Sequence, residues 1–374
     1  MSALFQSLTL RNLTLANRVV VSPMCQYSAI GGNAQSWHDV HVGQLAMSAA
    51  GMLILEATAI EDIGRITPGC LGLYSDDNER HLQGLLDTVR GLIPNVKLPV
   101  CIQLSHAGRK SSSHVPWKTG AQIPVDQGGW QSVAPDSIAH KESEQAPRAL
   151  SIDAMNMLKE KFVAATVRSD KLGIDAIELH AAHGYLLHQF LSPLSNKRED
   201  GYGGTLENRM RFPLEVFVAM RNSWPNRKPL GVRLSASDWD VESSWNINES
   251  AVFSQRLAEL GCDWIDVSSG GLSSNQKIDL KPGYQVHFAQ YIKQRVDIPV
   301  MAVGLITDAH QADRIVAEGQ ADMVALARAF LYNPRWVWHA AALLGETVTA
   351  PEQYWRCAPS DTGRLFGDTP IGQR

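Results

Sequence analysis

Eight short apolar runs recur along the chain, at 18–22, 52–56, 99–103, 176–180, 230–233, 264–268, 299–303 and 323–327. Between and after them, segments have the apolar spacing of helices, at 38–50, 77–91, 152–172, 206–222, 249–260, 286–294, 309–317 and 334–344. Strands that alternate with helices are typical of βα units around a parallel sheet, and eight parallel strands are enough to close a barrel. We therefore predict the α/β class and a single (β/α)8 TIM barrel.

Three of the predicted strands share one kind of start, in which a helix ends at a glycine and an aspartate follows. The pairs are Gly173 and Asp175, Gly261 and Asp263, and Gly319 and Asp322. Glycine suits the left-handed residue that commonly ends a helix, so these pairs support the helix-to-strand assignment.

Two connections are longer than the others, at 105–148 after the third strand and 192–205 after the fourth. Long loops that follow barrel strands commonly cover the active-site mouth, and we expect this of the first. The second contains Asp200-Gly-Tyr-Gly-Gly204, which predicts tight turns. Segment 3–15, with Arg11-Asn12 as its turn, predicts a hairpin that closes the barrel bottom. No low-complexity linker interrupts the chain, so we expect one domain over 1–374.

Composition excludes several classes of protein. The 374 residues carry a net charge of −4, which offers no basic excess to attract nucleic acid or an anionic membrane surface. The five cysteines form no CxxC pair, which disfavours iron–sulfur clusters, structural zinc and a disulfide framework. No apolar segment approaches the roughly 20 residues of a membrane helix, and the first residues have no basic stretch followed by an apolar core, so we expect neither export nor a membrane span. We expect a cytoplasmic enzyme.

His180 and His183, followed by Tyr185, stand where the fourth strand passes into a loop, and barrels place their chemistry at such strand ends. Two nearby imidazoles also favour zinc, but no third ligand stands close by and the pair leaves a strand instead of sharing a helix face. We therefore expect no metal. A hydrogen-bonded pair in the core is the plainer alternative. Two imidazoles can donate hydrogen bonds to one substrate oxygen, and Tyr185 can then deliver a proton.

Polar residues at the other strand ends predict one continuous site around the mouth. They are Ser22 to Cys25, Glu56 with Ala57, Gln103, Arg233, Ser268, Val303 with Gly304, and Ala327 with Arg328. An amide at Gln103 and a cation at Arg233 suit a planar heterocycle with imide edges that becomes anionic on reduction. Gly304 and Arg328 follow the seventh and eighth strands, where barrels commonly bind phosphate. For Arg328 a surface ion pair is an equal alternative.

Cys25 has two interpretations. A free cysteine is by default a small buried apolar residue, but this one ends the first strand and would face the site. A nucleophilic thiol would need a base, which His180 or His183 could supply. We favour the other use of the histidines, with Tyr185.

Four motifs follow one another along the chain: Ser22-Pro-Met-Cys25, Gln103, His180-Ala-Ala-His-Gly-Tyr185 and Ser195-Asn-Lys-Arg-Glu-Asp-Gly-Tyr-Gly-Gly204. In this order they resemble the old yellow enzyme family of FMN-dependent ene reductases. The resemblance runs from Leu4 to about Arg356 and is closest to the xenobiotic reductase, or thermophilic-like, branch. It implies an FMN site made by Ser22, Pro23, Met24, Cys25, Ala57, Gln103, Arg233, Gly304, Ala327 and Arg328. It also implies that His180 and His183 hold a substrate carbonyl, that Tyr27 and Tyr185 lie alongside, and that Cys25 tunes the flavin without a covalent bond.

The reaction that the resemblance implies is a ping-pong hydride transfer. NADPH, or NADH, reduces flavin N5, and an α,β-unsaturated carbonyl compound then takes the hydride at its β-carbon, with Tyr185 as proton donor. A non-redox barrel lyase that binds phosphate, or a metal-dependent hydrolase, is the alternative on the same fold.

Two features depart from the family pattern, and a third concerns its assembly. Ala327 stands where the family often has glycine, and the loop 111–131, with Trp117 and Trp130, is longer than in compact members. Tyr354-Trp-Arg356 resembles a segment that some relatives insert into a neighbouring subunit. We therefore expect a homodimer or larger homo-oligomer, with Arg356 as a substrate contact across subunits and a solvated tail as the equal alternative.

Overall fold

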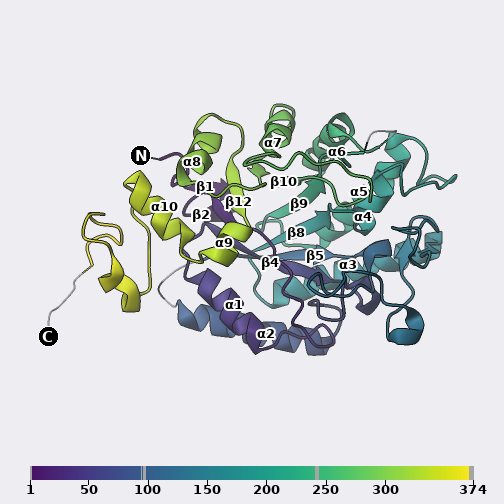
Figure 1. Ribbon diagram of the computed structural model, residues 1–374, viewed down its shortest axis with the longest axis horizontal. Coiled ribbons are helices and arrows are strands. Elements are labelled where there is room, and N and C mark those ends of the chain that lie inside the picture. Colours follow the sequence, from purple (N-terminus) through teal and green to yellow (C-terminus); the bar gives the residue numbers. More distant parts are fainter. Residues whose placement is uncertain (1, 94, 96–97, 241–243, 370–374) are drawn as a thin grey trace.

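The computed structural model describes residues 2–93, 95, 98–240 and 244–369 and contains a closed barrel of eight parallel strands (Figure 1). The strands are β3 (Val19–Val21), β4 (Met52–Ala59), β5 (Val100–Ser105), β8 (Ala176–Ala181), β9 (Leu230–Ser235), β10 (Ile265–Ser268), β11 (Val300–Ala302) and β12 (Met323–Leu326). Each corresponds to a predicted run, and the closed order β3-β4-β5-β8-β9-β10-β11-β12 confirms the (β/α)8 barrel.

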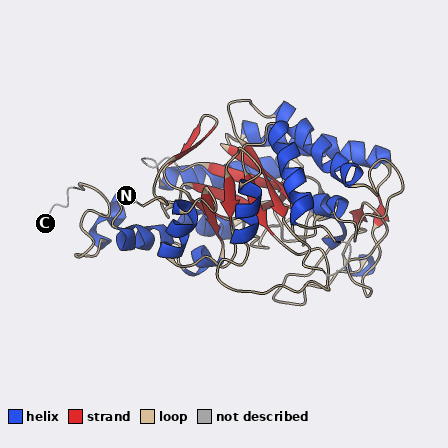
Figure 2. Ribbon diagram, turned by 90° about the horizontal axis from the view of Figure 1, so that it is seen from above, coloured by secondary structure: helices blue, strands red, loops and turns tan. Residues whose placement is uncertain are grey.

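Helices surround the barrel (Figure 2) and bury the outward faces of its strands, which is why the strands read as continuous apolar runs. The predicted helices are α1 (Ser36–Ala46), α2 (Asp76–Leu92), α3 (Ile152–Lys171), α5 (Leu206–Ser223), α6 (Ile247–Glu259), α7 (Val286–Lys293), α8 (Ala309–Ala317) and α10 (Trp336–Leu344). Two short helices were not predicted, α4 (Leu186–Leu191) and α9 (Arg328–Tyr332). No helix in this described part of the chain is long and apolar enough to cross a membrane.

The glycine and aspartate pairs before three strands have a common geometry. Gly173, Gly261 and Gly319 have φ of 68°, 92° and 68°, as expected for helix ends. Each aspartate accepts a hydrogen bond through Oδ2 from the first backbone N–H of a neighbouring strand. These hydrogen bonds join Asp175 to the Val100 N–H (2.9 Å), Asp263 to the Leu230 N–H (2.8 Å) and Asp322 to the Val300 N–H (2.9 Å). The aspartates therefore fix the starts of adjacent strands relative to one another.

The N-terminal hairpin is confirmed as β1 (Leu8–Leu10) paired antiparallel with β2 (Leu13–Leu15). Arg11 takes the left-handed conformation of a tight turn, with φ of 50°. Three hairpin leucines, Leu10, Leu13 and Leu15, share a buried cluster with Met52, Ala176, Trp264, Met301 and Met323, which lie at or next to strand starts. The hairpin thus closes the end of the barrel opposite the strand ends that carry the polar residues.

The two long connections lie where they were predicted. The first includes η2 (Gly108–Lys110), η3 (Val125–Gln127) and β6 (Val133–Ala134), which pairs with β7 (Arg148–Ala149). Trp130 ties it to η1 (Asp62–Gly64), after β4, because its Nε1 donates to Ile63 O at 2.9 Å. In the second, a Cβ on Gly203 would lie 2.1 Å from Arg198 O, so the turn requires glycine there.

Candidate active site

Side chains from distant parts of the sequence meet at the C-terminal ends of the barrel strands. Arg233 at β9 donates from Nη1 to Ser22 Oγ after β3 (3.0 Å), and its Nε lies 3.2 Å from Asp266 Oδ2 on β10. His183, after β8, has Nε2 2.7 Å from Ser268 Oγ. These contacts join β3, β8, β9 and β10 around one mouth, as the strand-end pattern predicted.

His180 and His183 form an adjacent pair at this mouth. Their rings are 5.2 Å apart and nearly perpendicular, with His180 Nε2 3.4 Å from His183 Nδ1. The Ala182 N–H donates to His180 Nδ1 (3.2 Å), so the ring proton of His180 sits on Nε2 and faces the pair. Burial, and after it the nearby positive charge of Arg233, lower the pKa of both histidines well below the ordinary value, so both rings are neutral near pH 7.

The backbone at His183 is in a costly conformation. His183 has φ of 57° and Gly184 has φ of 73°, and a left-handed residue other than glycine costs about 1–2 kcal/mol. Lys110 Nζ helps to hold the turn by donating to His183 O (2.9 Å) and Gly271 O (2.7 Å). Sequence reasoning missed Lys110, because it lies beyond the strand end, in η2.

Lys110 and His180 both contact Tyr185. The ammonium of Lys110 lies 5.2 Å from the ring centroid, and the His180 ring packs edge-on at 5.0 Å. Burial lowers the pKa of Lys110 to about 8. Burial, and next the neighbouring Cys25 thiol, raise the pKa of Tyr185 well above its ordinary value. The phenol therefore keeps its proton and is available as an acid.

Cys25 and Tyr27 lie on the other side of the mouth. Contact with the Cys70 thiol and burial raise the pKa of Cys25 well above its ordinary value, so this residue is a thiol near pH 7 and not a nucleophilic thiolate. Sequence reasoning missed Cys70, which is 45 positions away in the chain. The Tyr27 ring packs edge-on against Trp117 (5.6 Å), which brings the 111–131 loop to this side of the site.

Gln103 and Arg233 are buried at the mouth, 2% and 6% exposed, above a layer of acidic groups. Gln103 Nε2 donates to Glu178 Oε1 at 2.8 Å. Burial, and then the nearby carboxylate of Asp266, raise the pKa of Glu178 to about 8. The amide and the guanidinium therefore offer the donor set that the strand-end pattern predicted, with acidic partners inside the barrel.

Gly304 and Arg328 lie at the ends of β11 and β12. Gly304 has φ of 130°, and a Cβ there would lie 3.0 Å from Gln285 Nε2, so glycine is needed. Ala327 precedes the first residue of α9, which is Arg328. Arg328 is exposed, and no carboxylate among the described residues lies within ion-pair distance of it.

The remaining residues predicted for the site come from the first two barrel strands and from the segment after α10. Pro23 and Met24 are half-buried between Ser22 and Cys25, and Ala57 is buried on β4. The strand continues to Ala59 with a bulge between Leu55 and Thr58, three residues beyond its predicted end. Arg356 belongs to η4 (Glu352–Cys357), which follows α10 and packs against it through Tyr354, whose ring lies 5.7 Å from that of Trp338. The segment after α10 lies at the edge of the molecule (Figure 1).

The surroundings of the histidine pair bear on the zinc alternative. Among the residues that the structure describes, no group of three or more His, Cys, Asp or Glu is placed to hold a metal ion. The geometry supplies proton donors, neutral imidazoles and a buried cation instead.

Comparison with known proteins identifies the family. The sequence profile of the NADH:flavin oxidoreductase / NADH oxidase family matches residues 3–345. The chain is 41% identical over 357 residues to the NADPH dehydrogenase of Geobacillus thermodenitrificans (strain NG80-2), which covers 95% of this chain and 98% of that relative. It is 38% identical over 355 residues to the NADPH dehydrogenase of Bacillus subtilis (strain 168), with 94% and 98% covered.

A solved structure agrees with these relatives. Morphinone reductase in complex with tetrahydroNAD matches with a TM-score of 0.74 at 26% identity, over 99% of this chain and 98% of that one. The resemblance to the old yellow enzyme family is thereby confirmed. The chain belongs to the NADH:flavin oxidoreductase / NADH oxidase family and is an FMN oxidoreductase that takes electrons from NAD(P)H.

Proposed function

We propose that this enzyme reduces the activated C=C bond of α,β-unsaturated carbonyl compounds. When bound, FMN would supply the hydride chemistry between NAD(P)H and the β-carbon of the alkene. The observation that carries the proposal is the convergence of His180, His183 and Tyr185 at one strand end, as neutral imidazoles beside a protonated phenol.

The donor set at the mouth fits FMN. Gln103 and Arg233 offer a neutral amide and a fixed cation where a ring with imide edges needs them. Gly304, with φ of 130°, would present its backbone to a phosphate at the end of β11, and exposed Arg328 has no carboxylate within ion-pair distance among the described residues. The residues that would hold FMN are Ser22, Pro23, Met24, Cys25, Ala57, Gln103, Arg233, Gly304, Ala327 and Arg328.

The histidine pair would bind the substrate carbonyl. His180 carries its proton on Nε2 and would donate it to the substrate oxygen in place of its contact with His183 Nδ1. For His183 we assign the proton to Nδ1 in the substrate complex, with the Ser268 hydroxyl donating to Nε2. Two donors on one oxygen stabilise the negative charge that develops there as the β-carbon is reduced.

Tyr185 would deliver the proton to the α-carbon. Its raised pKa is the property that supports this role, since the phenol stays protonated across the physiological range. Tyr27 would line the opposite wall with Cys25, whose protonated thiol contacts substrate without forming a bond.

The assembly and the location of the enzyme are further parts of the proposal. Arg356 would contact substrate in a neighbouring subunit of a homodimer or larger homo-oligomer, and the position of η4 outside its own barrel supports this. Five free thiols are typical of a reducing compartment, which supports the cytoplasm. We treat 1–374 as one FMN-binding domain, which the single closed barrel supports.

The test is product formation under anaerobic conditions. Purified enzyme with FMN, NADPH and 2-cyclohexen-1-one should yield cyclohexanone, one molecule for each NADPH oxidised, as measured by gas chromatography. Oxidation of NADPH only when oxygen is admitted, with no saturated ketone, would contradict the proposed substrate class.

A further inference from the structure

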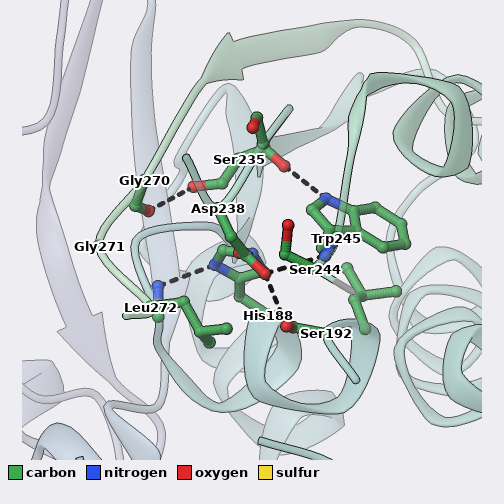
Figure 3. Close-up of polar contacts among 12 residues, drawn as sticks. His188, Ser192, Ser235, Asp238, Ser244, Trp245, Gly270, Gly271 and Leu272 are labelled. Carbon is green, nitrogen blue, oxygen red and sulfur yellow. Dashed lines mark hydrogen bonds and ion pairs between the residues drawn. The ribbon is translucent and has the colours of Figure 1, made fainter. Parts of the chain in front are cut away.

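A buried polar network lies behind the mouth, between α4 and the loop that follows β9 (Figure 3). Its centre is a contact between His188 of α4 and Asp238 of that loop, with Nε2 and Oδ1 2.9 Å apart and both side chains 0% exposed. A carboxylate is costly to bury unless its oxygens are satisfied, so its other partners indicate what the pair does.

Asp238 holds two further groups. Its Oδ2 accepts hydrogen bonds from Ser192 Oγ (2.7 Å), at the end of α4, and from the Trp245 backbone N–H (3.0 Å). Trp245 in turn donates from Nε1 to Ser235 O (2.6 Å). Figure 3 shows these groups gathered around the carboxylate, which therefore joins α4 to the segment before α6.

His188 connects this carboxylate to the site. Its Nδ1 accepts a hydrogen bond from the Gly184 backbone N–H at 2.9 Å, so Nδ1 carries no proton. The ring proton is then on Nε2, the atom that faces Asp238. The negative charge of the carboxylate beside Nε2 favours this tautomer, although the two atoms do not meet hydrogen-bond geometry. In this tautomer Nδ1 accepts from the peptide N–H between His183 and Gly184.

The peptide on the other side of His183 is held in the same way. The His183 N–H donates to Ser235 Oγ (2.9 Å), whose hydroxyl donates to Gly270 O (2.9 Å). Space is tight here, since a Cβ on Gly184 would lie 2.1 Å from Gly271 O. His183 is left-handed, so its ring direction depends on how the two peptides beside it are held. Ser235 and His188 bind the N–H groups of these peptides, in addition to the contacts of Lys110 with His183 O and of Ser268 with the ring.

We propose that His188 and Asp238 are positioning residues for His183. Asp238 keeps His188 in the tautomer that accepts from Gly184, and this hydrogen bond holds the His183 ring in the direction in which it binds the carbonyl. The inference rests on the proposed role of His183 and adds two residues that do not touch substrate.

Two substitutions at His188 each keep one of its two contacts, with the Gly184 N–H or with Asp238, and remove the other. In His188→Asn the side-chain oxygen reaches the place of Nδ1 and can still accept from Gly184. In His188→Gln the amide reaches the place of Nε2 and contacts Asp238 but leaves the Gly184 N–H without its acceptor. The readouts are FMN content, melting temperature, and the dissociation constant of 4-hydroxybenzaldehyde from its change in flavin absorbance.

The two variants should differ in binding. We expect His188→Gln to weaken phenol binding about tenfold with FMN retained, and His188→Asn to stay within about threefold of the unsubstituted enzyme. Equal losses in both variants, in proportion to a fall in melting temperature, would mean that His188 only supports the fold, and would overturn the inference.

A double-substitution cycle tests whether His188 acts through His183. In a His183→Ala background, His188→Gln should weaken phenol binding no further, because the ring it positions is gone. A further tenfold loss would overturn the inference while leaving the role of His183 intact. Unchanged phenol binding in His183→Ala alone would overturn the proposed function of His183 instead, and this inference with it.

Ser235→Ala provides a second route if the His188 variants fold poorly. It removes the acceptor on the other side of His183 without disturbing the Asp238 pair. It should weaken phenol binding in the His183-containing enzyme and have no effect in the His183→Ala background. An effect of equal size in both backgrounds would count against the positioning of His183 by these two hydrogen bonds.

Discussion

At the scale of single residues, the surroundings of His180 and His183, and not their spacing in the sequence, determine their protonation states. Burial and nearby positive charge keep both rings neutral, and the Ala182 N–H sets the tautomer of His180. A neutral imidazole with a fixed N–H is a hydrogen-bond donor that also avoids placing a second charge beside Arg233.

Replacing either histidine should weaken substrate binding and leave FMN in place. Each of His180→Ala and His183→Ala removes one hydrogen bond to the bound oxygen, so we expect about 10- to 100-fold weaker binding of 4-hydroxybenzaldehyde. Titration of the flavin absorbance measures this. His81→Ala, on the exposed face of α2, is the matched control and should change nothing. Loss of flavin from either mouth variant would contradict the role given to it.

Tyr185→Phe should slow reoxidation of the reduced enzyme by an enone by about 10²–10⁴-fold, since the proton donor is removed. Because burial raises the pKa of Tyr185, the protonated form that acts as acid persists above the ordinary value of 10 and is lost only at higher pH. The rate constant in the unsubstituted enzyme, followed by stopped-flow absorbance, should therefore show no fall assigned to this group up to pH 10. A Tyr185-dependent fall centred well below pH 10 would contradict this.

At the scale of elements, the aspartates before three strands are a repeated structural feature with a measurable role. Asp175→Ala would leave the buried N–H of Val100 without an acceptor, which should lower the free energy of unfolding by about 1–3 kcal/mol. Asp175→Asn keeps an oxygen acceptor and should recover most of that loss. Urea unfolding at saturating FMN measures both, with exposed Asp126→Ala as control. Equal losses in the Ala and Asn variants would assign the effect to charge instead.

The barrel could be predicted from sequence because each strand and helix carries its own local pattern. Every barrel strand is an apolar run, and three begin after a glycine and an aspartate whose geometry the structure confirms. The short helix α4 was missed because its residues are all buried, so no polar face marks its period. The bulge in β4 was missed because pairing with β5 determines it.

The site could be predicted only where it coincides with strand ends. His180, Arg233 and Ser22 were found because parallel strands place their ends together. Lys110 lies in η2, and Cys70 and Asp238 lie in loops, so their contacts depend on how these segments fold over the mouth. Ser235 ends β9, but its role was missed because its partner, the His183 N–H, is placed by the turn after β8. A buried histidine in a six-residue helix and an aspartate 50 positions away could not be paired from one sequence.

At the scale of the whole molecule, bound FMN should contribute to stability, since its proposed ligands come from both halves of the chain. Removal of FMN should lower the melting temperature, and added FMN should restore it with rising concentration. At 100 times the dissociation constant the expected gain is about 2.7 kcal/mol. A melting temperature independent of FMN would contradict a site built from the folded barrel.

In the proposed reaction, one mouth performs both reduction by NADPH and reoxidation by an enone. An anaerobic absorbance titration of the FMN-loaded protein tests the two half-reactions in turn, with NADPH added first and 2-cyclohexen-1-one second. We expect NADPH to bleach the flavin band and the enone to restore it. A band that NADPH bleaches but the enone does not restore would contradict the ene reductase proposal. A protein that remains colourless after incubation with FMN would contradict the site itself.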